Sequence, residues 1–488
     1  MHHIYILLFS FLTFLLGHSS VAQRESRQLN LQECIDVALE NNLTVKRSAL
    51  DAERSKISVQ ESQASRLPNL NFGANYGNNW GRSIDPTTNS FIAQQINTSG
   101  LSGNSSLSLF TGGQIYFSIK QSQLNLSAAQ YDLARTKDNI AMNIANFYLN
   151  VIFNQELLEN ARLQLTSTQQ QLNRTQRLVA AGSLPRTSEL ALISQLAGDE
   201  VTLINAQNSL ALAVLNLKQA MLIPASEEIE IVIPDIDVEQ LITENQTIQE
   251  IYDHAIGVRP EIKSAYLRVE SANVGLKISK GAYYPSLRLN GNLFTNYSDI
   301  ADRERIIYDN LTPVIQDVPI GFYVDGSMLE VPVYSRITSG TIIGTESFNR
   351  SRQWRENFSQ SLSFNLSVPV FNNLRTSSNV QRAKIQLQQS EIAVKEQTNQ
   401  LRQAIESAFN DTQSSQKSFL ASKKQVEALE ETLRIIESQY NLGAANFTEY
   451  QIASNNLFAA KSDLARSKFN YIFKQKILDF YQNRPLTF

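Results

Sequence analysis

The stretch LPNLNFGANYGNNW, residues 67–80, returns later in the chain as YPSLRLNGNLFTNY, residues 284–297. These two copies lie 217 residues apart. A later pair of matching segments, FTGG at 110–113 and FNNL at 371–374, lies 261 residues apart. The 44 residues by which the two offsets differ all fall inside the second copy, before FNNL. This regular self-similarity, from about residue 31 onward, predicts an internally duplicated architecture.

Apolar and small polar residues alternate within both copies. In residues 67–80, leucine, phenylalanine, alanine and tyrosine alternate with asparagine and glycine. The same alternation in residues 101–110 and 358–371 completes two hairpins, 69–110 and 285–371. A period of two with Asn, Gly and Ser is typical of membrane β-barrel strands. Each strand is also long enough to cross a bilayer when tilted.

A half-buried sheet of a soluble protein would show the same alternation. Two features favour the membrane. The helices use their apolar residues for contacts with one another, which leaves nothing to cover the apolar face of the strands. Aromatic side chains also gather near the far strand ends, where an interfacial girdle would lie. They are Tyr76, Trp80, Tyr297 and Phe358.

Residues 114–181 contain no proline and no glycine. They predict one helix roughly 100 Å long at a rise of 1.5 Å per residue. Its apolar residues keep heptad spacing, which implies helices that supercoil against neighbours. The same heptad spacing recurs 261 residues later, in the second repeat, where Thr412 is the one polar residue. The first track is Ile144, Val151, Leu158, Leu165, Leu172 and Val179, and its copy is Ile405, Thr412, Phe419, Val426, Leu433 and Tyr440.

The long helix is expected to end at Gly182, because glycine readily adopts the left-handed conformation that terminates helices. Pro185 suits the first turn of the next helix, which would return over residues 186–221. The second copy repeats this reversal. One shorter helix per repeat, 31–66 and 248–281, is expected to stack on the returning helix and match the length of the long one.

The chain divides into a signal peptide, two repeats and a linker. An apolar run at 4–16 before the small residues of 20–22 predicts a cleaved signal peptide over residues 1–22. The alternative, a membrane anchor, needs about 18–20 apolar residues. The repeats span 23–223, with a helix hairpin at 114–222, and 248–488, with an external insert at 299–357 and a helix hairpin at 375–482; the linker is 224–247. The charged insert is expected to form an external loop, and a lid, a receptor for phage and a merely solvated excursion all remain open as its role.

Composition argues against several classes of function. The net charge of −3 gives no basic face for nucleic acid. Cys34 is the one cysteine, and His254 would be the one histidine left after signal-peptide cleavage. We therefore expect no internal disulfide, no catalytic residues, no metal and no cofactor. No segment after the signal peptide is apolar enough for a membrane helix.

Four strands cannot close a barrel, and an open sheet edge in hydrocarbon costs several kcal/mol per unpaired backbone group. The chain is therefore expected to oligomerise, with two, three or four copies supplying 8, 12 or 16 strands. The long helices would project from the membrane as a second, coaxial barrel. The neutral polar run QLTSTQQQLNRTQR, residues 164–177, is either a solvated surface or the lining of a passive duct.

With these features the sequence resembles the TolC-like family of outer-membrane efflux and export channels, from residue 31 to about 481. The likeness implies an α+β membrane protein that forms a homotrimer. Each chain would give four strands to a twelve-stranded β-barrel in the outer membrane and long coiled-coil helices to a periplasmic α-barrel. Residues 224–247 would form an equatorial segment around this tunnel. The segments that carry the likeness are LPNL (67–70), YPSL (284–287), LFTGGQ (109–114), VPVFNN (368–373), YNLG (440–443) and NNWGRSIDPT (78–87).

The same resemblance implies a passive channel in a tripartite efflux or type I export system. A periplasmic adaptor (membrane-fusion) protein would dock at the helix tips and couple the channel to an inner-membrane pump of the proton-driven or ABC type. Outer-membrane lipid would surround the barrel, and nucleic acid would have no role. The docking residues would be Gly182, Ser183, Leu184, Gly443, Ala444 and Ala445.

In relatives an acidic ring narrows the tunnel inside the second tip, and Glu449 matches one such position. Three carboxylates around a small bore would attract cations and resist anions. The chain departs from the family pattern at Ile452, where a second acid would stand, and at Ala445, where an arginine would stand. In the first tip, Ser188 occupies the position at which relatives have a polar residue that helps to keep the tunnel closed. Because the chain departs from the charged network of its relatives, closure of the tunnel would rest on Tyr440 and close packing. Alternatively, Glu449 is a solvent-facing residue favoured by the helix dipole.

Two other functions remain open from the sequence. A periplasmic coiled-coil scaffold without a pore would explain the heptads but not the alternating strands. An enzyme would require a phosphate-binding glycine loop or metal-ligand spacing, and the sequence offers neither. Within the channel class, small-molecule efflux and protein export cannot be separated, because selectivity largely belongs to the pump.

Overall fold

The computed structural model describes residues 27–84, 89, 91–92, 95–234, 238, 246–301, 304–324, 326 and 330–486, so the predicted signal peptide lies outside the described residues. The chain forms two compact units, and each repeat contributes to both. In the described part of the chain no helix is both long and apolar enough to cross a membrane. The helical unit comprises Met1–Ser58, Ser122–Ala272 and Ile385–Phe488, and the sheet unit comprises Val59–Gln121 and Asn273–Lys384.

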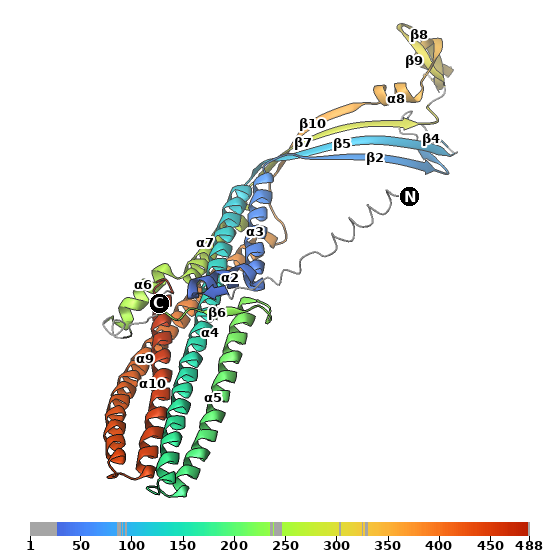
Figure 1. Ribbon diagram of the computed structural model, residues 1–488. Coiled ribbons are helices and arrows are strands. Elements are labelled where there is room, and N and C mark those ends of the chain that lie inside the picture. The colour runs from blue at the N-terminus through green and yellow to red at the C-terminus, as the bar shows by residue number, and fades with distance from the viewer. Residues whose placement is uncertain are drawn as a thin grey trace, which may run out of the picture. The chain divides into compact units, whose positions relative to one another are not determined.

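Four helices run side by side in the helical unit (Figure 1). Two of them, α4 (Gln114–Ala180) and α9 (Arg375–Asn441), have 67 residues each and begin 261 positions apart. Each is followed by a returning helix, α5 (Arg186–Met221) or α10 (Phe447–Tyr481). The predicted long helices, their returns and their offset are confirmed.

The heptad tracks of α4 and α9 contribute buried residues to the core of the helical unit. Burying each aliphatic side chain contributes about 1.5–3 kcal/mol relative to leaving it exposed. Thr412, the polar exception, is also buried, and its hydroxyl donates to the carbonyl of Ala408 at 2.8 Å. It therefore leaves no unpaired polar group in the core. The buried apolar members of the tracks are Ile144, Val151, Leu158, Leu172, Ile405, Phe419 and Val426.

The two shorter helices are each broken in two, which corrects the prediction of single helices. The first is α2 (Leu31–Asn41) and α3 (Leu43–Ala64), and the second is α6 (Ile248–Val258) and α7 (Pro260–Gly281). At the first break, the side chain of Asn42 accepts hydrogen bonds from the next helix, as an N-cap does. At the second, the proline that begins α7 disfavours helical geometry in the residue before it.

The N-terminus of the described chain is tied to the linker. β1 (Arg27–Leu29) pairs in parallel with β6 (Ile229–Ile231), which lies within the predicted linker 224–247. Just after β6, the hydroxyl of Tyr148 on α4 donates to the carbonyl of Val232 at 2.5 Å. Burial is the main reason that the pKa of Tyr148 rises to about 12. Part of the linker therefore packs on the long helix.

The sheet unit contains four antiparallel strands in the order β10-β7-β5-β2 (Figure 1). They are β2 (Asn69–Asn79), β5 (Ile96–Thr111), β7 (Ser286–Ser298) and β10 (Ser359–Ser367). The two predicted hairpins thus lie next to each other. β5 begins earlier than predicted and β10 ends earlier. A short pair, β3 (Ser83–Ile84) and β4 (Phe91–Ile92), connects β2 to β5; the rest of that loop, including residues 85–88, lies outside the described residues.

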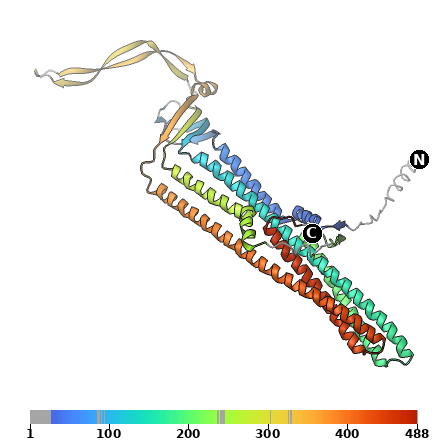
Figure 2. The same cartoon turned by 90° about the vertical axis from the view of Figure 1, so that its left-hand side faces the viewer.

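The insert at 299–357 has regular secondary structure, and its predicted external position stays a prediction. It forms a long antiparallel hairpin of β8 (Glu304–Val324) and β9 (Glu330–Ser347), followed by the short helix α8 (Arg350–Glu356). Figure 2 shows this hairpin as a separate two-stranded ribbon. The segments are rich in isoleucine, valine and tyrosine, which favour strands. The loop was predicted because the insert also contains many charged residues.

Candidate functional site

The two helix tips end their long helices in the same way. Gly182 and Gly443 both have a φ of 75°, a left-handed conformation that costs other residues energy. The amide of Ser183 donates to the carbonyl of Leu178 at 2.9 Å, and the equivalent amide of Ala444 makes the same bond at 2.8 Å. These bonds close the last helical turn and reverse the chain. The predicted helix ends at both glycines are confirmed.

The two returning helices begin differently. The side chain of Asn446 accepts from the amide of Glu449 at 2.9 Å, and the Glu449 carboxylate accepts from the amide of Asn446 at 3.1 Å. This capping box satisfies two otherwise free amides of α10. The equivalent positions of the first tip hold Pro185 and Ser188, which make no such box. Pro185, expected in the first turn of α5, is instead the residue before the helix, with an extended ψ of 148°.

An aromatic cluster distinguishes the second tip. The rings of Tyr440 and Tyr450 stack with centroids 5.5 Å apart, and the Phe447 ring lies 6.3 Å from that of Tyr440. Burial raises the pKa of Tyr450. The hydroxyl of Tyr440 is buried without a hydrogen-bond partner among the described residues. Since Val179 occupies the equivalent position in the first repeat, the two tips are not interchangeable.

A buried polar layer just above the tips joins the two repeats. Gln451 on α10 donates to Gln195 on α5 at 2.7 Å. Gln195 in turn donates to the buried carboxylate of Asp199 at 2.8 Å, which also accepts from the hydroxyl of Thr168 on α4 at 2.6 Å. This layer was not predicted from the sequence. The clue was available, because the second repeat has leucine and alanine at the positions equivalent to Thr168 and Asp199.

The predicted site residues all lie at the two tips. Glu449 is exposed and held in its capping box, and Ser188 is half-buried with its amide bonded to Pro185. A ring of carboxylates requires further copies of the chain, so the constriction of Glu449, Ser188 and Tyr440 stays a prediction. Of the predicted docking residues, Gly182, Ser183, Gly443 and Ala444 are exposed, and Leu184 and Ala445 are half-buried. Their docking role also stays a prediction.

The four-stranded sheet has one largely apolar face and one largely polar face, on which Phe294 is an apolar exception. Cross-strand partners point to the same face, so the register assigns each side chain. Phe72, Gly103 and Leu293 share the apolar face, whereas Asn71 and Asn104 share the polar face. The apolar side chains are uncovered, as those of a lipid-facing barrel wall would be. The exposed ones are Leu70, Phe72, Tyr76, Leu293, Leu362, Phe364 and Leu366.

The predicted aromatic girdle is wrong at one position. Tyr76, Trp80 and Phe358 are exposed, but Tyr297 is only 6% exposed. The guanidinium of Arg350 lies 4.7 Å from the centre of the Tyr297 ring. Tyr297 therefore packs beneath α8, a helix that the sequence analysis did not foresee.

Residues 34–221 and 341–475 match the outer membrane efflux protein family. Together they are more than half of the chain. The chain belongs to the outer membrane efflux protein family. As an efflux protein of this family, it is an outer-membrane protein that extends into the periplasm, and the predicted localisation is confirmed.

Individual relatives agree with this assignment. The efflux protein is 22% identical to the outer membrane protein TolC of Escherichia coli K12 over 469 residues. The aligned region covers 94% of this chain and 82% of TolC. The crystal structure of VceC from Vibrio cholerae matches with a TM-score of 0.69 at 15% identity, covering 94% of this chain and 97% of VceC. The open-state structure of the Neisseria gonorrhoeae MtrE outer membrane channel matches with a TM-score of 0.67 at 15% identity, covering 97% of this chain and 95% of MtrE. The TolC-like fold is confirmed.

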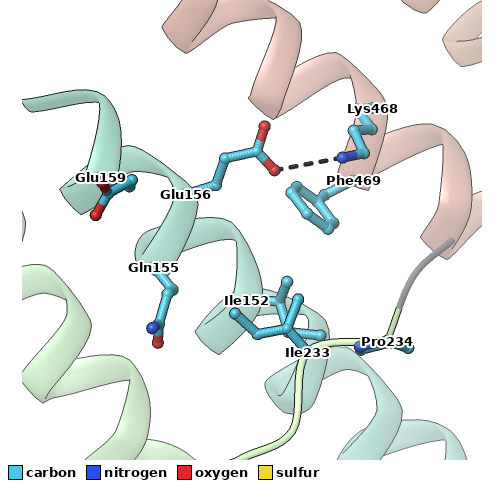
Figure 3. Close-up of a pocket in the computed structure, with 8 residues that line it drawn as sticks. All are labelled: Ile152, Gln155, Glu156, Glu159, Ile233, Pro234, Lys468 and Phe469. Carbon is cyan, nitrogen blue, oxygen red and sulfur yellow. Dashed lines mark hydrogen bonds and ion pairs between the residues drawn. The ribbon is translucent and has the colours of Figure 1, made fainter. Parts of the chain in front are cut away.

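The efflux protein also has a cavity of about 570 Å³ between α4, α10 and the linker (Figure 3). Its walls are half apolar and half polar, and they carry one ion pair, between Glu156 and Lys468 at 3.5 Å. Ile152, Ile233 and Phe469 supply apolar walls. Nowhere in the described residues do three or more His, Cys, Asp or Glu side chains form a group that could hold a metal ion.

Proposed function

We propose that this efflux protein is a homotrimeric channel that passively conducts substrates across the outer membrane. The observation that carries this proposal is the four-stranded sheet, with an exposed apolar face, a polar face and two open edges at β2 and β10. The apolar face would contact lipid, and the polar face would line a water-filled bore. A pore-free periplasmic scaffold would have no use for such a sheet.

The open edges support assembly into a closed barrel. β2 and β10 run in opposite directions, because each of the three neighbouring strand pairs is antiparallel. β2 of one copy can therefore pair antiparallel with β10 of the next, as barrel closure requires. Three copies would give twelve strands, within the range of known outer-membrane barrels. The unpaired backbone groups of both edges would then all be satisfied.

The helical unit offers a second contact surface for neighbouring copies. α5 buries Leu217 within the chain. An apolar track on α5 faces outward, at spacings of three to eight residues, and is not covered by the described residues of the chain. Coiled-coil neighbours bury such tracks. Its members are Leu190, Ile193, Val201, Ile204 and Leu212, each at least 45% exposed.

The tips are the proposed contact with the rest of the export machinery. The exposed turns at residues 181–185 and 442–446 would receive a periplasmic adaptor, which would couple the channel to an inner-membrane pump of the proton-driven or ABC type. The channel itself would catalyse nothing and would need no cofactor. Glu449, Ser188 and Tyr440 would narrow the bore near its periplasmic end.

Native mass spectrometry and solute flux test this function together. The purified full-length protein should carry the mass of three chains, and vesicles that contain it should release small hydrophilic solutes. A mature protein that stays monomeric and dissolves without detergent would support the scaffold instead. A trimer that inserts into vesicles but releases no solute would contradict the channel.

A further inference from the structure

Helix α8 completes the hydrogen bonding of an open strand edge. β10 begins at Ser359, opposite Phe294, so the last residues of β7 have no strand beside them on that side. The side-chain amide of Asn357 donates to the carbonyl of Asn296 at 2.8 Å. The buried side chain of Gln353 on α8 accepts from the amide of Ser298 at 3.0 Å and donates to its carbonyl at 3.1 Å. Two side-chain amides thus replace the missing strand.

The same helix lies on the apolar face of the sheet. Thr295 and Tyr297 share that face with Leu293, because strand residues alternate. The hydroxyl of Thr295 donates to the carbonyl of Trp354 at 2.7 Å, and Arg350 covers the Tyr297 ring. In Figure 1, α8 lies next to the end of β7 and directly precedes β10 in the chain.

The position of α8 along β7 corresponds to a membrane boundary. The apolar face of β7 starts at Leu287, and Tyr297 lies ten residues further along the strand. At about 3.3 Å per residue and a tilt of about 40°, this separation spans about 25 Å across the membrane. The lipid-facing band of outer-membrane barrels is about 25 Å tall. If Leu287 marks one boundary, α8 therefore lies at the other, on the external side.

The exposed surface of α8 is basic and carries a tryptophan. Arg352 is neutralised by ion pairs to Glu346 at 2.6 Å and to Glu356 at 2.5 Å. Arg350 and Arg355 are exposed, and Trp354 is half-buried. Guanidinium groups bind phosphate with two parallel hydrogen bonds, and tryptophan favours the membrane–water interface. This combination is suited to the phosphate-bearing headgroup of an anionic lipid.

We propose that α8 binds anionic lipid headgroups of the outer leaflet through Arg350 and Arg355, beside Trp354. The lipid would lie against the apolar face of the sheet, with its phosphate at the α8 arginines. The site rests on the proposed function, because it requires the apolar face to contact the membrane. It would hold the strand edge that α8 caps in a fixed position at the membrane boundary.

Fluorescence quenching by brominated lipids tests the site, because the chain has two tryptophans, Trp80 and Trp354. The full-length Trp80→Phe protein, in which Trp354 alone fluoresces, is placed in vesicles of phosphatidylcholine and phosphatidylglycerol. Either one or the other lipid is brominated. We expect phosphatidylglycerol to be enriched about fivefold beside Trp354. Substituting glutamine for both Arg350 and Arg355 should remove the enrichment, whereas the exposed control Arg466→Gln should retain it.

The Trp354→Phe protein, in which Trp80 alone fluoresces, separates the two proposals. Quenching of Trp80 without quenching of Trp354 would overturn the α8 site and leave the channel intact. Equal quenching of Trp354 by both lipids, or an enrichment that persists in the double variant, would also overturn the site. If lipid quenches neither tryptophan, the membrane placement of the sheet fails, and the channel proposal fails with it.

Discussion

A β-carbon built on Gly112 would lie 2.2 Å from the carbonyl oxygen of Gly281. Gly112 lies between β5 and α4, and Gly281 is the last residue of α7. The two backbones touch where a strand of the sheet unit gives way to a long helix. Gly112 also has a φ of 61°, so both its conformation and its surroundings require glycine.

Gly112→Ala is therefore expected to destabilise the protein by about 3 kcal/mol or more, from left-handed strain together with overpacking. Gly182→Ala is the matched control. Gly182 has a similar left-handed φ, but a β-carbon there would meet nothing within 4 Å, so only the strain of about 1–2 kcal/mol applies. Thermal unfolding of the purified variants measures the difference. Equal losses at both sites would show that the contact with Gly281 is unimportant.

Leu374→Gly should stabilise the protein. Leu374 has a φ of 62°, is largely exposed, and occupies the position equivalent to Gly113 of the first repeat. A left-handed leucine costs roughly 1–2 kcal/mol, and the greater chain entropy of glycine offsets about half of this. The unfolding midpoint should rise slightly in Leu374→Gly and should not rise in the exposed control Leu442→Gly. A lower midpoint for Leu374→Gly would contradict the strain.

Arg259→Met should be strongly destabilising, by about 3–5 kcal/mol. Arg259 is buried at the break between α6 and α7 and forms ion pairs with Glu261 at 3.0 Å and Asp138 at 3.4 Å. Removing the cation leaves two carboxylates without compensation. The control is Arg268→Met, because Arg268 is 62% exposed in its pair with Asp132 and exposed pairs contribute about 0–1 kcal/mol. Thermal unfolding measures the loss of stability in each variant. Similar losses in the two variants would contradict the stabilising role of the buried ion pairs of Arg259.

Asp138 should give the stability a defined pH dependence. Burial raises its pKa above the ordinary value of 3.8, although Arg259 acts in the opposite direction. Between 3.8 and the raised pKa, the folded protein binds more protons than the unfolded chain, so the free energy of unfolding falls as pH rises through this window. Asp138→Asn should lack this fall. Unfolding midpoints of both proteins at several pH values test it, and parallel profiles would contradict the raised pKa.

Glu449→Gln should lower cation preference without destabilising the tip, because glutamine can also complete a capping box. If three Glu449 carboxylates line the bore, the ratio of cation to anion permeability should fall by at least about twofold. Reversal potentials in a salt gradient measure this ratio. Glu53→Gln, at an exposed position of α3 far from the tips in sequence, should leave it unchanged. An unchanged ratio in Glu449→Gln would favour the simple helix-capping role.

The long helices and the strands could be predicted from the sequence because the pattern of each element occurs in both repeats. Gln114 and Arg375 begin helices of equal length, as the offset requires. The helix breaks at Asn42 and Arg259 were missed because the spacing of apolar residues does not show where a helix is capped. The proline that follows Arg259 was the available signal for the second break. The α8 helix was missed because its arginines suggested a solvated loop.

The candidate site was predictable only in part. The glycines that reverse the chain at Gly182 and Gly443 follow from conformational preference, and the structure has both in the left-handed region. The buried carboxylate of Asp199 was missed because a lone acid on a polar helix usually faces solvent. The apolar residues at the equivalent positions of the second repeat were the available clue. The capping role of Glu449 depends on Asn446 three residues earlier. Any role in a ring depends on neighbouring copies of the chain.

Single-channel recording in planar lipid bilayers decides whether this efflux protein is a conducting channel. The purified trimer should produce discrete, reproducible current steps as it inserts. Insertion is verified independently through quenching of Trp80 by brominated lipid. A trimer that is inserted by this criterion and yet carries no ionic current would contradict the proposed channel.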